Sequence, residues 1–182
     1  MPPSLEEYRW RLANIAIGPS TLRNQGASGV AEIARNFLAE LDLSRFIRHG
    51  FFEQELNRQT VQLKKKFPEG AKNWGTARKA INLFLGEAYY HRFICRAYQI
   101  NKIEQSLEVP LDRTVATFLF CEARRLNIKL PHWPGIKNLE LAVSQPYQDF
   151  ASYFARTAMQ QWSRIHLDVI IWRGRADVKK AG

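Results

Sequence analysis

Apolar residues recur every three or four positions along most of this chain, the period that places them on one face of a helix. We predict a first helix of about four turns beginning at residue 5, followed by helices over residues 30–41, 52–66, 76–100, 112–127, 138–143 and 144–172. The run at 76–100 is either one helix or two helices broken near Gly86. Because no strand pattern or internal repeat is present, the sequence predicts an all-α fold.

Polar residues mark several of the predicted helix ends. Ser4 and Glu7 have the spacing of a capping box, and Asp112 follows Pro110 where an aspartate can cap a helix start. The segments GPSTLRNQGASG (18–29) and LPHWPGI (130–136) are rich in glycine and proline, so we expect both to be loops.

The composition predicts one helical domain, residues 1–182, that binds a polyanion. With 182 residues and 46% apolar content, the chain can bury a sizeable core, which we expect to form two lobes with a charged tail at about 175–182. The formal charge of +10 favours nucleic acid as the partner. No run of about 18 apolar residues is present, so a membrane is not expected as a partner.

The N-terminus and the cysteines indicate a cytoplasmic protein. Residues 1–18 have acidic residues before their apolar stretch and no positively charged leader, so they do not resemble a signal peptide. Cys95 and Cys121 fall in predicted helices without the spacing of a zinc site or a disulfide framework, and we expect both to be buried thiols.

Two short motifs carry the candidate chemistry. GTARKAINLFL occupies residues 75–85, and EVPLDRTVATFL occupies residues 108–119. Together they resemble the helix-hairpin-helix DNA glycosylases, the superfamily of endonuclease III and oxoguanine glycosylase, where the segments LPGVGRKTANVVL and VPVDTHV occur in the same order. A weaker match is RIHLDVIIWRGR at residues 164–175. The matching positions are Gly75, Arg78, Lys79, Asn82, Leu85, Val109, Pro110, Asp112 and Val115.

The resemblance implies that Lys79 is a nucleophile and Asp112 an essential carboxylate. It implies a glycosylase with AP lyase activity that excises a damaged or modified base from duplex DNA. A neutral lysine amine can attack the anomeric carbon and form a Schiff base, while a carboxylate stabilises the developing positive charge. Burial and neighbouring cations such as Arg78 lower the pKa of an ammonium group and favour its neutral form. On a helical wheel Lys79 lies outside the apolar stripe, so it can face a cleft.

The resemblance also implies a hairpin at about residues 68–88 that binds a DNA phosphate through backbone N–H groups, with a bound monovalent cation. This sequence departs from the family there, because LPGVG is replaced by AKNWGTA. No iron-sulfur cluster, other metal or required cofactor is expected, since the cluster cysteines have no counterpart after Trp172. The predicted DNA contacts are Trp74, Gly75, Thr76, Ala77 and Arg78, with Arg23 and Gln25 from the loop at 18–29.

An enzyme that extrudes a base needs a wedge to fill the stack and groups that hold the base. Gln25 is the candidate wedge. The base-pocket candidates are Trp133, His166, Asp168 and Trp172, and further aromatic candidates are Trp10, Tyr89, Tyr90, His132 and Trp162. Core packing is the alternative for each aromatic residue, and hydrogen bonding inside the fold is the alternative for His166 and Asp168.

Other interpretations of the same residues stay open. Lys79 can be an ordinary solvated helix lysine, and Asp112 can be a helix cap alone. At the level of function, the main alternative is a non-enzymatic helix-hairpin-helix protein that binds DNA through the same basic surface. A third is a helical interaction protein whose charge serves solubility, and whose behaviour with nucleic acid would not depend on salt.

Overall fold

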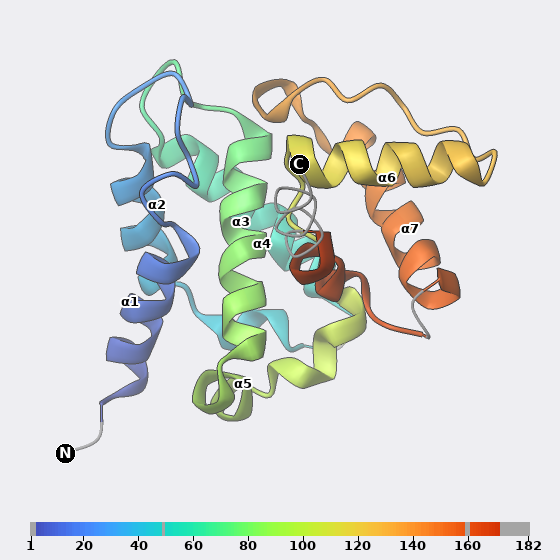
Figure 1. Ribbon diagram of the computed structural model, residues 1–182. Coiled ribbons are helices and arrows are strands. Elements are labelled where there is room, and N and C mark those ends of the chain that lie inside the picture. The colour runs from blue at the N-terminus through green and yellow to red at the C-terminus, as the bar shows by residue number, and fades with distance from the viewer. Residues whose placement is uncertain (1–2, 49, 159–160, 172–182) are drawn as a thin grey trace, which may run out of the picture.

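The computed structural model describes residues 3–48, 50–158 and 161–171, and this part of the chain contains helices and no strands (Figure 1). The all-α prediction is therefore confirmed. The α-helices are α1 (Leu5–Ala16), α2 (Val30–Ala39), α3 (Phe52–Lys66), α4 (Trp74–Tyr90), α5 (Arg92–Tyr98), α6 (Arg113–Arg125) and α7 (Leu141–Ala158). Short 3-10 turns are η1 (Leu43–Phe46), η2 (Ile100–Ser106), η3 (Ile136–Asn138) and η4 (Arg164–His166).

The first hydrophobic core surrounds α4, which runs through the middle of the molecule (Figure 1). The predicted apolar stripe of α4 is buried, and Ala80, Ile81 and Phe84 have no exposed surface. Helices α1, α2 and α3 pack against this stripe. The N-terminal half of the chain thus forms a helical layer that holds one face of α4 and leaves another face toward the second half.

The second hydrophobic core lies between α6 and α7, on the other side of α4 in Figure 1. Leu119 of α6 and Tyr147 of α7 are completely buried in it. The segment at 164–171 reaches both cores, because Ile165 belongs to the first and Leu167 belongs to the second. Two cores joined along α4 agree with the two-lobed arrangement expected from the sequence.

The course of α4 and the burial of the cysteines differ from the sequence predictions. α4 continues through Gly86 and ends at Tyr90, where His91 caps the start of α5 by accepting a hydrogen bond from the Ile94 N–H. Gly86 instead allows a close approach, because a Cβ there would lie 3.3 Å from the Ile165 Cδ1. Cys121 is exposed on α6 and Cys95 is half-buried, so the prediction of two buried thiols is wrong.

The predicted helix over 144–172 is also wrong, because the helical path is interrupted after α7. Residues 161–163 are not helical, η4 follows, and residues 167–171 are helical again. The interruption lets Ser163 and Arg164 hydrogen-bond with Glu104 and the Leu107 carbonyl oxygen. The predicted short helix at 138–143 and the start of the long one form a single helix, α7, with Pro146 in its second turn.

Within the described residues, no helix has both the length and the apolar character that crossing a bilayer requires. The predicted tail at 175–182 lies outside the described residues.

Candidate active site

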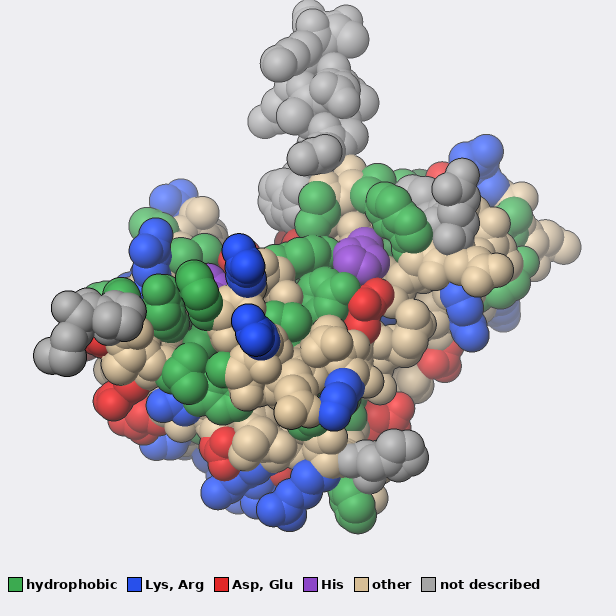
Figure 2. All heavy atoms as spheres, turned by 90° about the horizontal axis from the view of Figure 1, so that it is seen from below, with side chains coloured by type: hydrophobic (Ala, Val, Ile, Leu, Met, Phe, Trp, Pro, Cys, Tyr) green, Lys and Arg blue, Asp and Glu red, His purple; other side chains and the backbone are tan. Residues whose placement is uncertain are grey.

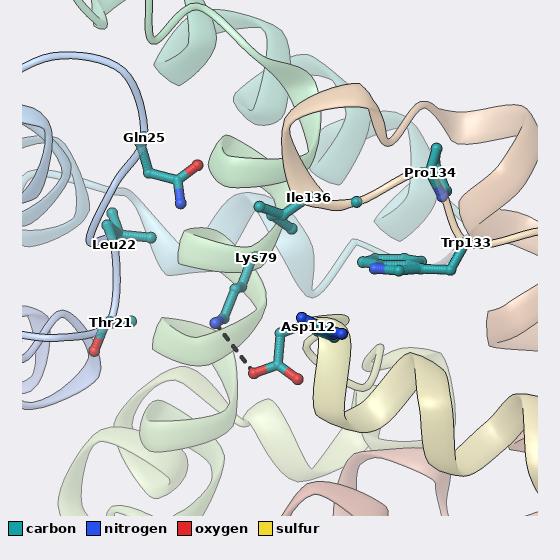
Figure 3. Close-up of a pocket in the computed structure, with 10 residues that line it drawn as sticks. Thr21, Leu22, Gln25, Lys79, Asp112, Trp133, Pro134 and Ile136 are labelled. Atoms are coloured by element: carbon teal, nitrogen blue, oxygen red, sulfur yellow. Dashed lines mark hydrogen bonds and ion pairs between the residues drawn. The ribbon is translucent and has the colours of Figure 1, made fainter.

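Lys79 and Asp112, which are 33 positions apart in the sequence, meet in the structure (Figure 3). The Lys79 Nζ donates a hydrogen bond to the Asp112 Oδ2 at 3.2 Å. Their side chains are 15% and 17% exposed, so the ion pair is shielded from most solvent and still accessible. Lys79 projects from α4 and Asp112 lies at the start of α6, so each half of the fold supplies one member of the pair.

The position of Asp112 follows from helix capping. Its Oδ1 accepts hydrogen bonds from the backbone N–H groups of Thr114 at 2.8 Å and Val115 at 3.0 Å. These bonds occupy one carboxylate oxygen and leave Oδ2 for Lys79. The predicted capping role is confirmed, and it fixes the carboxylate in place for any chemistry at Lys79.

A buried polar network positions α4 against the segment that leads into α6. The Arg78 guanidinium binds both carboxylate oxygens of Glu108 at 2.8 and 2.7 Å, and Asn82 donates to the same carboxylate. Arg78 also donates to the Asn57 and Thr60 side chains of α3. The charge of Arg78 is therefore matched by Glu108, and Arg78 is not the free neighbouring cation that the sequence suggested.

A pocket of about 450 Å³ opens at the ion pair, between the two halves of the molecule (Figure 3). Lys79 and Asp112 form its floor, and Arg113 also lines it. The walls come from two loops that the sequence identified only as loops. Their lining residues are Thr21, Leu22 and Gln25 on one side, and Trp133, Pro134, Gly135 and Ile136 on the other.

A smaller hollow of about 340 Å³ adjoins the same ion pair. Ser20, Leu83 and Asp168 are among its lining residues, together with Lys79 and Asp112. The structure therefore places two of the predicted base-pocket residues near the pair, Trp133 in the larger pocket and Asp168 in the smaller hollow.

Two glycines allow the wall at 133–136 to take its position. Gly135 has φ +83° and ψ 155°, a combination that residues with a Cβ rarely adopt. Gly75 lies directly beneath this wall, since a Cβ there would collide with the Ile136 carbonyl oxygen. The loop can therefore rest on the first turn of α4 and close the pocket beside Lys79.

The residues at the start of α4 that were predicted to contact DNA lie inside the fold. Gly75, Thr76, Ala77 and Arg78 are buried. Gly75 lies beneath the 133–136 loop and Arg78 binds Glu108, so their contacts with DNA stay predictions that this burial does not favour. Trp74 is half-buried against the second core, with the Arg78 guanidinium 5.2 Å from its ring centroid. The helix-hairpin-helix element and its cation stay predictions.

Gln25, the predicted wedge, is engaged inside the fold, and its wedge role stays a prediction. The Gln25 side chain is 8% exposed, accepts a hydrogen bond from the Thr76 hydroxyl at 2.6 Å and donates to the Arg23 carbonyl oxygen. It is held in the pocket wall and cannot enter a base stack without breaking both bonds. Arg23 is exposed, so its contact with DNA stays a prediction.

His166 is held in a hydrogen-bond network away from the pocket. Its Nδ1 lies 2.8 Å from the Tyr90 hydroxyl and its Nε2 lies 3.3 Å from the Glu104 Oε1. Hydrogen bonds that Glu104 accepts from Ser163 and Tyr89 hold the pKa of this carboxyl below its ordinary value. The structure therefore supports the alternative of hydrogen bonding for His166. The fourth base-pocket candidate, Trp172, lies outside the described residues.

Within the described ranges, no group of three or more His, Cys, Asp or Glu residues could hold a metal ion. The chain matches no protein-family model, no curated protein and no solved structure.

Proposed function

We propose that this protein is a DNA glycosylase with AP lyase activity, acting on a damaged or modified base through Lys79. The observation that carries the proposal is the 3.2 Å contact between the Lys79 Nζ and the Asp112 Oδ2 at the floor of a pocket. An amine that can reach a reacting carbon, beside a fixed carboxylate, is the arrangement that Schiff-base chemistry needs. The formal charge of +10 supports DNA as the substrate.

The proposed reaction uses the ion pair in both of its steps. Lys79, after losing a proton, attacks the anomeric carbon of the sugar, and the glycosidic bond breaks with its electron pair leaving on the base. Asp112 stabilises the positive charge that develops on the sugar. Opening of the sugar ring then gives an imine between the carbon and Lys79. Loss of the adjacent C2′ proton expels the 3′-phosphate, and water releases the sugar fragment from Lys79.

The shape of the pocket supports a single extruded base as its ligand. A volume of about 450 Å³ lies in the range of small-molecule sites. The Trp133 indole supplies an aromatic wall on which a base can stack, and Leu22 supplies an apolar surface on the facing loop. Arg113, which also lines the pocket, is exposed and can contact a phosphate of the same strand.

Borohydride trapping tests this proposal. The protein is incubated with duplexes that carry an abasic site or one of several modified bases, and reduction then captures any imine. We expect a covalent adduct with wild type and none with Lys79→Gln. Asp112→Asn should keep the cap and lower the rate of base release by at least about 100-fold, the scale of a fixed electrostatic contribution. Lys65→Gln, an exposed lysine on α3, is the matched control.

The same experiment separates this proposal from the non-enzymatic alternative. Salt-dependent duplex binding without an adduct or base release would show a DNA-binding protein in which Lys79 is inert. An adduct that persists in Lys79→Gln would assign the chemistry to another amine.

A further inference from the structure

Helix α5 and the residues beside it carry a surface that the proposed pocket does not use. We call it the α5 face and define it by Tyr90, Arg92, Phe93, Arg96, Lys102 and Trp162. Figure 2 views the molecule from this side and shows hydrophobic side chains and an acidic one beside a histidine, with Lys and Arg side chains elsewhere on the same face.

Three aromatic rings of this face are exposed although they are hydrophobic. Phe93 is 57% exposed, Trp162 is 48% exposed and Tyr90 is 47% exposed. Within the described chain these rings leave large apolar surfaces in water, which is costly for a protein that could bury them. Such surfaces indicate a ligand that offers flat, apolar groups.

The same rings are held in fixed orientations. Tyr8 stacks on one side of the Phe93 ring, with centroids 5.6 Å apart. The Tyr90 hydroxyl is hydrogen-bonded to His166. The Trp162 ring packs in a T-shaped arrangement with the same histidine, with ring centroids 5.8 Å apart. Because Glu104 in turn holds His166, a ligand that stacks on these rings pays little entropy to order them.

Exposed cationic side chains lie on the same face as these rings, and the carboxylates of Glu87, Glu104 and Asp168 lie near Tyr90. Arg92, Arg96 and Lys102 are all exposed, and none of them forms an ion pair within the part of the chain that the structure describes. Glu104 is the one acidic residue between positions 89 and 106, and its carboxylate is engaged by Tyr89, Ser163 and His166. The face therefore presents cations and flat rings together.

We infer that the α5 face binds single-stranded nucleic acid, with unpaired bases stacked on Tyr90, Phe93 and Trp162 and phosphates near Arg92, Arg96 and Lys102. Cations that follow a backbone, combined with aromatic rings, are the features by which proteins bind single strands without reading sequence. A duplex keeps its bases stacked on one another and offers only phosphates to this surface, so it should bind here more weakly. An anionic membrane would also attract the cations of this face. It offers no flat groups on which the three rings could stack.

The test is binding of a fluorescein-labelled oligothymidylate, followed by anisotropy across a range of salt concentrations. Phe93→Ala with Trp162→Ala should weaken binding about 10-fold or more and leave the salt dependence unchanged. Reversing Arg92, Arg96 and Lys102 to Glu should reduce the slope of log affinity against log salt by about 2, since each phosphate contact in a single strand contributes about 0.7.

Matched variants on α6 and just after its C-terminal end, called the α6 variants, control for net charge and for loss of an exposed ring. Arg124, Arg125 and Lys129 reversed to Glu change the charge equally, and Phe120→Ala removes another exposed aromatic. Both should bind the oligothymidylate as wild type does. The inference is overturned if the α6 variants lose as much affinity as the α5 variants, if the aromatic variant binds normally, or if vesicles of anionic lipid displace the oligothymidylate from wild type.

This inference can fail or hold separately from the proposed enzyme activity. Lys79→Gln should bind the oligothymidylate normally, because Lys79 lies in the pocket and not on the α5 face. The α5 variants should still be trapped on a short duplex that carries an abasic site. Circular dichroism and the thermal midpoint check that each variant folds. The residues substituted in the α5 variants and in the α6 variants are all exposed, so we expect these variants to fold.

Discussion

Arg78 and Glu108 form a buried ion pair with two parallel hydrogen bonds, and this pair aligns the two residues of the candidate site. Their side chains are 4% and 5% exposed, and the bonds are 2.8 and 2.7 Å long. Arg78 immediately precedes Lys79, and Glu108 lies four residues before Asp112. The pair therefore fixes the spacing between α4 and the start of α6.

Removing either partner of this ion pair should destabilise the protein strongly. Arg78→Ala and Glu108→Ala each leave a charge buried without its partner, and we expect each to lower the free energy of unfolding by about 3–5 kcal/mol. In chemical denaturation the double variant should lose much less than the sum of the single losses, because neither charge is left alone. Additive losses would mean that the two side chains do not interact.

Gly75→Ala should destabilise the fold and disturb the pocket wall. The added Cβ collides with the Ile136 carbonyl oxygen and approaches the Leu139 Cβ, so we expect a loss of about 1–3 kcal/mol in unfolding free energy. Gly18→Ala is the matched control, since a Cβ there meets its nearest neighbour at an ordinary 3.5 Å. Equal thermal midpoints for the two variants would contradict the close packing at Gly75.

Substitutions at Asp112 separate its structural role from its proposed chemical role. Asp112→Ala removes the cap of α6 and should cost about 1 kcal/mol in unfolding free energy. Asp112→Asn keeps an oxygen acceptor for the cap and should cost less, although it removes the negative charge beside Lys79. Thermal unfolding ranks the two variants, and an equal stability loss in the two would show that the ion pair, which both variants lose, outweighs the cap.

Trp133→Ala should affect base release more than chemistry at an abasic site, if the proposed function holds. The indole lines the pocket and packs in a T-shaped arrangement with the Tyr147 ring, with ring centroids 5.8 Å apart. Loss of a stacking surface should slow excision of a modified base about 10-fold or more. Borohydride trapping on a duplex with a ready-made abasic site should change little, because that substrate has no base to hold. An equal loss in both assays would indicate a general distortion of the pocket.

The Glu104 network predicts a contribution to stability that depends on pH. Hydrogen bonds from Ser163 and Tyr89 lower the pKa of Glu104 below its ordinary value of 4.5. The folded pKa is therefore below the unfolded one, so the stabilisation is complete above pH 4.5 and is lost as pH falls through the folded value. The difference in unfolding free energy between wild type and Glu104→Gln should shrink as pH falls below about 4.5. A constant difference would contradict the role of the ionised carboxylate.

Local patterns in the sequence were sufficient for much of the fold. The capping box of Ser4 and Glu7 and the cap at Asp112 are both present, because such signals involve residues within a few positions of one another. The break after α7 was not predicted, since it depends on hydrogen bonds of Ser163 and Arg164 to residues more than 50 positions earlier. The spacing of apolar residues indicates which face of a helix is buried, and it does not indicate hydrogen bonds between distant segments.

The candidate site was predictable in part for the same reason. The order of two motifs led to Lys79 and Asp112, and the structure brings them together. Sequence alone could not show that Arg78 faces Glu108 while its neighbour Lys79 faces the pocket, because the two side chains differ only in their direction around α4. The pocket walls at Leu22 and Ile136 come from loops. The path of a loop cannot be predicted from the helical spacing of apolar residues.

The division of the fold into two cores has a consequence for damaged or immature molecules. Lys79 is anchored to the core around α4, whereas Asp112 is anchored to the core between α6 and α7. If the second core melts while the first persists, the lysine loses its carboxylate and half of its pocket at the same moment. A half-folded chain would then still carry its positive charge but would lack the paired Lys79 and Asp112, so that the proposed strand cleavage would arise only in molecules whose assembly is complete.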